Sequence, residues 1–163
     1  MLVDSDIRLD KLKGQITFPR GRAFLLGSDV WSAMKLRQEW NPQVEAALKQ
    51  QWINYGRELG RRMWALVGKE LDITFEVLEE SAAQAGWGTL RAEGDKNHGT
   101  HLDFKLGNCV FCEGLKGQFK QPCCYELSGT IQGLAEVLYG ARTVKEVKCA
   151  SGVWDVCEVE VSQ

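Results

Sequence analysis

Apolar residues recur at helical spacing through the middle of the chain. Between residues 42 and 68 one returns every three or four positions, which is the repeat of one face of an α-helix. The stripe consists of Val44, Leu48, Trp52, Tyr55, Leu59, Met63 and Leu66. Asn41 and Pro42 suit its start, as a cap and a first-turn residue, and Gly68 suits its end. The pattern predicts one long helix.

Two glycines, Gly56 and Gly60, interrupt this helix four positions apart. Glycine inside a helix costs stability relative to alanine, so a pair of them suggests that another backbone approaches closely. That backbone could belong to a second subunit, and simple tolerance of the glycines is the alternative.

Three further helices and an N-terminal hairpin are predicted. Residues 15–27 hold two apolar runs broken by Pro19 and Gly21, which indicates an entry strand or hairpin, and a helix capped by Ser28 or Asp29 follows towards Trp40. Helical spacing returns in two later stripes. They are Phe75, Leu78, Ala82 and Ala85, ended by Gly86, and Leu127, Ile131, Leu134 and Leu138 within 122–139, ended by Gly140.

The period changes to alternation in five segments, which we interpret as strands. They cover residues 87–93, 100–106, 108–113, 143–149 and 154–161. Short links between them favour antiparallel pairing, and helices followed by strands, a helix and a final hairpin predict an α+β fold. No linker or repeat divides the chain, so residues 1–163 are expected to form a single domain.

Charge and hydropathy narrow the classes of partner. With 20 basic and 22 acidic residues, the net charge of −2 provides no field that attracts nucleic acid. No apolar run is long enough to span a membrane, and the acidic N-terminal segment does not resemble a secretory signal. We therefore expect a cytoplasmic protein, in which six cysteines indicate metal binding, redox chemistry or burial rather than disulfides.

Two cysteines face each other if the last two strands form a hairpin centred on Val153. That register sets Cys149 opposite Cys157, Val147 opposite Val159 and Lys145 opposite Val161. The two sulfurs could then form a disulfide or bind one ion. Glu146 lies three residues before Cys149, so regular alternation turns it away from the cysteines, and only a bulge or bend would bring it back.

The other four cysteines are two pairs. Cys123 and Cys124 open the helix of residues 122–139, where the helix dipole favours a thiolate, and because adjacent side chains diverge, only one is expected to reach the hairpin thiols. Cys109 and Cys112 lie three apart on a predicted strand and so on opposite faces. Unless a turn intervenes they form a poor chelate, and we interpret them as buried core residues.

No active site assembles from the remaining chemistry. His98, His101 and Asp103 could form an open metal or acid–base site, but a hairpin loop with outward polar residues explains them better. There is no dinucleotide or phosphate-loop motif, so we expect a binding protein rather than an enzyme.

The segment from Gln121 to Val161 resembles the C-terminal half of the 4-vinyl reductase domain family. The matching residues are Pro122, a cysteine, Gly129, Gly133, Gly140, Glu146, Cys149, Gly152 and Cys157, followed by an alternating strand. The family includes a domain linked to bacteriochlorophyll synthesis and the sensing domains of aromatic-responsive transcription activators, and its fold is similar to that of TRAPP tethering subunits. The resemblance implies helices on an antiparallel sheet and a homodimer.

The resemblance also implies a metal site. Sensor members of the family hold zinc through three cysteines and a glutamate, and these roles fall on Cys124, Glu146, Cys149 and Cys157. Cys124 is preferred to Cys123 because it stands five residues before Gly129. Such a closed ligand set is typical of a structural zinc.

Large aromatic side chains supply a candidate pocket for a hydrophobic ligand. Candidates to line it are Trp52, Trp64, Phe75, Trp87 and Phe104, although for any one of them core packing is the more common role. The first hypothesis is a zinc-containing domain that binds a hydrophobic, aromatic or tetrapyrrole ligand as a sensor, carrier or assembly factor. The alternatives are an enzyme or accessory subunit of tetrapyrrole modification, and a dimeric scaffold without ligand.

Overall fold

Helices and strands follow the predicted order along the chain. A computed structural model describes residues 8–10, 15–18, 21–23 and 42–163. Near the N-terminus β1 (Arg8–Asp10), β2 (Gln15–Phe18) and β3 (Gly21–Ala23) form an antiparallel sheet in that order. The pairing of β2 with β3 confirms the hairpin predicted within residues 15–27. The helix predicted from Ser28 or Asp29 lies outside the described residues.

Three α-helices are described after residue 42. They are α2 (Pro42–Leu66), α3 (Leu71–Gln84) and α4 (Tyr125–Tyr139). Each ends close to the glycine that the sequence indicates, and Gly68, Gly86 and Gly140 all have the positive φ that glycine adopts without strain. None of the helices in the described part of the chain is long and apolar enough to cross a membrane.

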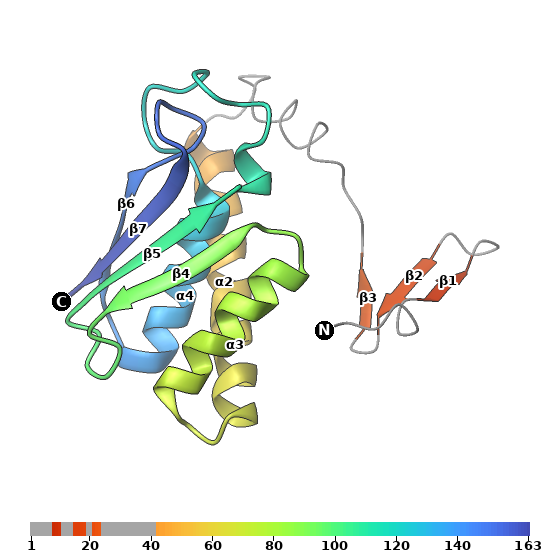
Figure 1. Cartoon of the computed structure of the whole chain (residues 1–163), viewed down its shortest axis with the longest axis vertical. Coiled ribbons are helices and arrows are strands. Elements are labelled where there is room, and N and C mark those ends of the chain that lie inside the picture. The colour runs from red at the N-terminus through yellow and green to blue at the C-terminus, as the bar shows by residue number, and fades with distance from the viewer. Residues whose placement is uncertain (1–7, 11–14, 19–20, 24–41) are drawn as a thin grey trace.

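The main sheet is antiparallel and has the order β4-β5-β7-β6. Its strands are β4 (Thr89–Gly94), β5 (His101–Gly107), β6 (Thr143–Lys148) and β7 (Val156–Ser162). The three helices lie along one face of this sheet (Figure 1). The inward residues of β5 and β7 are fully or almost fully buried, and on the outward face Lys105 of β5 forms an ion pair with Glu93 of β4. This is the α+β architecture that the sequence predicts.

The two central glycines of α2 pack against α4 of the same chain. A Cβ at Gly56 would overlap the carbonyl oxygen of Thr130, and one at Gly133 would overlap that of Ile53. Gly60 instead faces the side chains of Leu134 and Val137. The predicted close approach of another backbone is therefore confirmed at Gly56, and α4 provides it without a second subunit.

The buried face of α2 differs from the predicted apolar stripe. Ile53 and Met63 are buried together with the two glycines, whereas Tyr55 is 45% exposed and Leu66 is 64% exposed. The stripe was misplaced because a glycine at a helix contact marks the buried face without contributing to an apolar pattern.

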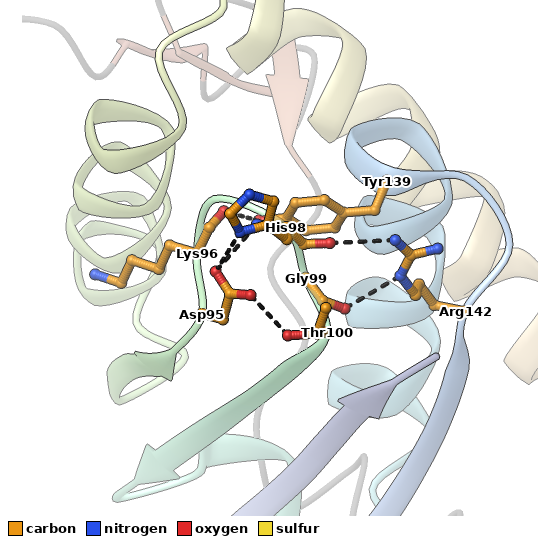
Figure 2. A network of polar contacts seen from close by, with 7 residues as sticks. All are labelled: Asp95, Lys96, His98, Gly99, Thr100, Tyr139 and Arg142. Atoms are coloured by element: carbon orange, nitrogen blue, oxygen red, sulfur yellow. Dashed lines mark hydrogen bonds and ion pairs between the residues drawn. The ribbon is translucent and has the colours of Figure 1, made fainter.

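The β4–β5 loop is tied to the end of α4 (Figure 2). The Asp95 carboxylate accepts hydrogen bonds from the Thr100 hydroxyl, at 2.6 Å, and from the backbone N–H of His98, at 3.1 Å. The Tyr139 hydroxyl donates to the carbonyl of Lys96, and Arg142 donates to the carbonyls of Gly99 and His98. The segment is thus an ordered hairpin loop, as interpreted from the sequence.

Candidate metal centre

All six cysteines are buried and none forms a disulfide. The strand predicted for residues 108–113 is wrong. The segment after β5 turns instead, through the 3₁₀ helix η2 (Val110–Cys112). Because a turn, not a strand, joins them, Cys109 and Cys112 contribute sulfurs to the same cluster.

The sulfur atoms gather between η2, the start of α4 and the β6–β7 hairpin. The Sγ atom of Cys112 lies 3.5 Å from that of Cys149 and 3.5 Å from that of Cys157, which is itself 3.9 Å from that of Cys149. The sulfurs of Cys109 and Cys124 are 3.8 Å apart. A disulfide bond is about 2.05 Å long, so these are contacts between free thiols.

Position relative to α4 separates the two adjacent cysteines. Cys124 is the N-cap residue of α4, is fully buried and belongs to the sulfur cluster. Cys123 contacts the Ser151 hydroxyl at 3.1 Å and belongs to no group of potential metal ligands among the described residues. The two side chains therefore have different neighbours: Cys124 is grouped with Cys109, Cys112 and Cys157, whereas Cys123 lies beside Ser151 and Cys149.

A β-bulge turns Glu146 towards the cysteines. Glu146 pairs with Val159 and Lys148 pairs with Glu158, so Val147 is an extra residue between them. The predicted pairs Val147 with Val159 and Lys145 with Val161 are wrong by one residue, since Val159 faces Glu146 and Val161 faces Val144. The bulge restores the predicted register beyond Lys148 and places Glu146 on the same face as Cys149.

The carboxylate of Glu146 connects the hairpin to α4. Both of its oxygens accept hydrogen bonds from the backbone N–H of Cys124, at 2.9 and 3.0 Å. Burial, followed by the negative charges of Cys124 and Cys149, raises the pKa of this carboxyl group to about 10.

The thiols share protons unevenly. Hydrogen bonds from neighbouring sulfurs, that of Cys109 first, lower the pKa of Cys112 to about 5 and hold the pKa of Cys124 well below its usual value. Cys109 and Cys157 donate the protons in these sulfur–sulfur hydrogen bonds, and donating them strongly raises the pKa values of both thiols. A metal ion would displace these protons, since thiolates are the species that bind metals.

These donors form two overlapping groups whose ligand atoms lie within 4.8 Å of one another. One group is Cys109, Cys112, Cys124 and Cys157, and the other is Glu146, Cys149 and Cys157. The four ligands implied by the resemblance are divided between them, with Cys124 in the first group, Glu146 and Cys149 in the second, and Cys157 in both.

The donor set fits zinc. Zn–S bonds of about 2.3 Å at the tetrahedral angle place neighbouring sulfurs about 3.8 Å apart. The separations of 3.5 to 3.9 Å between the cluster sulfurs bracket that value. Soft thiolates with one carboxylate in a buried site are donors that zinc accepts.

The predicted pocket residues divide between core and an aromatic cluster. Phe75 and Phe104 are buried against each other, with ring centroids 5.8 Å apart. Trp52 and Trp87 contact each other edge to face, and Tyr55 and Phe111 complete this cluster of rings. Trp64 is half-buried on α2.

A cavity of about 480 Å³ adjoins the thiol cluster, and none of the predicted pocket residues lines it. Cys109 and Cys112 line it on the η2 side, together with Gly86 and Val110. Ala150 and Trp154 of the β6–β7 hairpin line it as well, with Asn108, Glu113, Gly114, Lys116 and Asp155. Gly86 and Val110 directly precede Trp87 and Phe111 of the aromatic cluster in the chain.

The two histidines are surface residues. His98 contacts Asp95 at 3.1 Å and His101 contacts Asp103 at 3.5 Å, and both imidazoles are mostly exposed. Neither belongs to a group of three or more potential ligands within the described ranges. Their placement agrees with the loop interpretation.

Comparison with known proteins identifies the fold. No protein-family model and no curated protein matches the chain. Among solved structures, the phenol-responsive sensory domain of the transcription activator PoxR with phenol matches with a TM-score of 0.77 at 15% identity, over 96% of this chain and 84% of that one. The chain has the fold of this sensory domain.

Two other solved structures share the fold. A trafficking protein particle complex subunit 3 from Naegleria fowleri, covalently bound to palmitic acid, matches with a TM-score of 0.54 at 13% identity, over 83% of this chain and 91% of that one. A vinyl-4-reductase family protein from Methanocaldococcus jannaschii matches with a TM-score of 0.53 at 18% identity, over 87% and 98%. The fold predicted from the resemblance is confirmed.

Cys109 and Cys112 are buried, as expected, but they also belong to the thiol cluster, which the sequence does not indicate. The CxxC spacing was visible, but it was placed on a strand. Asn108 has a positive φ, which asparagine tolerates better than most residues, and Gly107-Asn108 immediately before Cys109 was the available indication of a turn.

Proposed function

We propose that the chain is a zinc-containing domain that binds a small molecule with an apolar or aromatic body, and that it acts as a sensor or carrier. The observation that carries the proposal is a cavity bordered by the buried thiol cluster, within the fold of a phenol-responsive sensory domain. Homodimerisation, which the family resemblance implies, stays a prediction.

The zinc part of the proposal assigns Cys124, Glu146, Cys149 and Cys157 as ligands on the ground of the resemblance. In the structure Cys124 lies in one donor group and Glu146 and Cys149 in the other, so a single ion would have to draw these side chains together. These residues come from the start of α4, from the β6 bulge and from the two arms of the final hairpin. An ion bound by them would join α4 to the hairpin and hold one wall of the cavity in place. Its role is structural, because a ligand set closed at four leaves no position for a reacting water.

The ligand part of the proposal places the small molecule in the cavity. Val110, Ala150 and Trp154 offer apolar surface, and Asn108 and the Lys116–Asp155 ion pair offer polar contacts for orientation. Its volume lies within the usual range of about 300–1,000 Å³ for small-molecule sites. The bound phenol and palmitic acid of two structural neighbours make aromatic and fatty-acyl compounds the first to test.

The experiment is a binding panel of phenol, larger aromatics, palmitate and a tetrapyrrole, followed by tryptophan fluorescence and isothermal titration calorimetry. We expect saturable quenching. Ala150→Phe, which places a phenyl ring in the cavity, should weaken the affinity at least ten-fold. Trp154→Phe should reduce the fluorescence change while calorimetry still detects binding.

Two outcomes would contradict the cavity assignment. Binding that survives Ala150→Phe but is lost in Trp87→Ala would move the ligand to the aromatic cluster. No binding of any compound by zinc-loaded protein would favour a scaffold without ligand.

A further inference from the structure

The thiol cluster contains more donors than one zinc ion uses. Five cysteines and one glutamate make up the two overlapping groups, whereas a tetrahedral zinc takes four ligands. Resting on the proposed metal site, we infer that the cluster is a two-metal centre, in which two tetrahedral divalent ions share the sulfurs of Cys112 and Cys157.

The number of donors matches such a centre. Two tetrahedra that share an edge need two bridging ligands and two terminal ligands on each ion, which makes six in all. The cluster provides six: Cys109, Cys112, Cys124, Glu146, Cys149 and Cys157. A single ion with the four proposed ligands would leave Cys109 and Cys112 unused.

The distances identify the bridging pair. Cys157 belongs to both groups, and Cys112 lies 3.5 Å from Cys157 and also 3.5 Å from Cys149 in the other group. An edge shared by two zinc–thiolate tetrahedra is about 3.8 Å long. Cys112 and Cys157 are therefore the two sulfurs with close neighbours on both sides.

The terminal ligands then divide as the structure divides them. Cys109 and Cys124, 3.8 Å apart, complete the first ion. Glu146 and Cys149, which are grouped with Cys157, complete the second, and Glu146 would have to move closer to Cys112 to bind it. Each ion would take ligands from distant parts of the chain, because η2, the N-cap of α4 and β7 meet on one side and the β6 bulge meets β7 on the other.

Charge balance and access favour a second ion. Fully ionised, the six donors carry six negative charges, and two divalent ions neutralise four of them where one neutralises two. Cys109 and Cys112 also line the cavity of about 480 Å³, so this half of the cluster borders open space through which an ion can enter.

The test is a cadmium-113 titration of metal-free, reduced, full-length protein, read by NMR and by elemental analysis after desalting. We expect two ions per chain and two resonances split by scalar coupling between the two nuclei, which requires a shared ligand. Cys109→Ser should keep the ion completed by Glu146 and Cys149, and should lose the ion completed by Cys109 and Cys124 or bind it at least ten-fold more weakly. Cys123→Ser, the matched change at a buried cysteine outside the cluster, should keep both.

Each alternative outcome is distinct. One ion per chain, unaffected by Cys109→Ser, would overturn the two-metal centre and leave the single-zinc proposal standing. Two ions without coupling would overturn the shared sulfurs. No bound ion would overturn the zinc proposal together with this inference. If Cys109→Ser does not fold, the stoichiometry and coupling of the wild-type protein still decide.

Discussion

Cys123 and Cys124 are adjacent residues just before the first turn of α4, and their side chains have different environments. Cys124 at the N-cap faces the cluster, whereas Cys123 contacts Ser151. Because of this difference, a substitution at Cys123 is a matched control for the same substitution at Cys124.

At this residue scale, Cys124→Ser is expected to lower the zinc content of the purified protein well below that of the wild type. Serine does not provide the soft thiolate that zinc prefers at this position. Cys123→Ser is expected to retain the wild-type zinc content. Elemental analysis of the two variants side by side measures this, and a loss confined to Cys123→Ser would reverse the ligand assignment.

Asp95 gives a second residue-scale prediction, for pH. The hydrogen bond from Thr100, followed by those from His98, lowers the pKa of Asp95 to about 2. A carboxyl group whose folded-state pKa is depressed stabilises the fold above its unfolded pKa of about 3.9, and this contribution is lost as pH falls towards 2. Asp95→Asn should therefore lower the melting temperature at pH 7, with the difference from wild type shrinking below about pH 4. An equal difference at pH 2.5 and pH 7 would show that charge plays no part.

At the scale of elements, the contact between α2 and α4 dominates the helical layer. Gly56→Ala is expected to destabilise the fold by about 1–3 kcal/mol or more, because the new methyl group meets the Thr130 backbone, which cannot move aside. Chemical denaturation measures the loss.

Gly60→Ala, one turn further along the same helix, is the matched control. Its methyl group would lie 3.1 Å from the flexible end of Leu134, and alanine is the better helix former by about 1 kcal/mol. We expect a change in stability much smaller than that of Gly56→Ala. Equal losses would mean that the close approach of the Thr130 backbone does not distinguish Gly56 from Gly60.

The elements themselves were largely predictable, because apolar periodicity and glycine stops reflect local chemistry. The sequence indicated α2, α3, α4 and all four strands of the main sheet to within a few residues. It misplaced the buried face of α2, where the contact is made by glycine, and it treated residues 108–113 as a strand, where Asn108 starts a turn.

The candidate site was only partly predictable for a related reason. The need for a bulge followed from the three-residue spacing between Glu146 and Cys149, but its position at Val147 depends on pairing with β7 across the hairpin. Likewise, the position of Cys109 and Cys112 in the thiol cluster depends on how η2 packs against α4 and β7. These are contacts between distant parts of the chain, which no local sequence pattern encodes.

At the scale of the whole molecule, the thiol cluster brings together segments that are far apart in the sequence. η2, the N-cap of α4, the bulge of β6 and the start of β7 all meet at the thiols, beside the cavity. Metal bound there stabilises the folded state in proportion to the logarithm of its concentration relative to its dissociation constant. If the proposed metal site is correct, the stability of the fold depends on metal concentration, and the cavity lies beside the metal.

The most direct test of this account is the zinc content of protein purified under reducing conditions without added metal, measured beside that of Cys157→Ser. Cys157 is the ligand common to both groups. We predict at least one zinc ion per chain in the wild type, and in the variant both a zinc content near zero and a lower melting temperature. A wild-type protein without stoichiometric metal, whose stability Cys157→Ser leaves unchanged, would contradict the account.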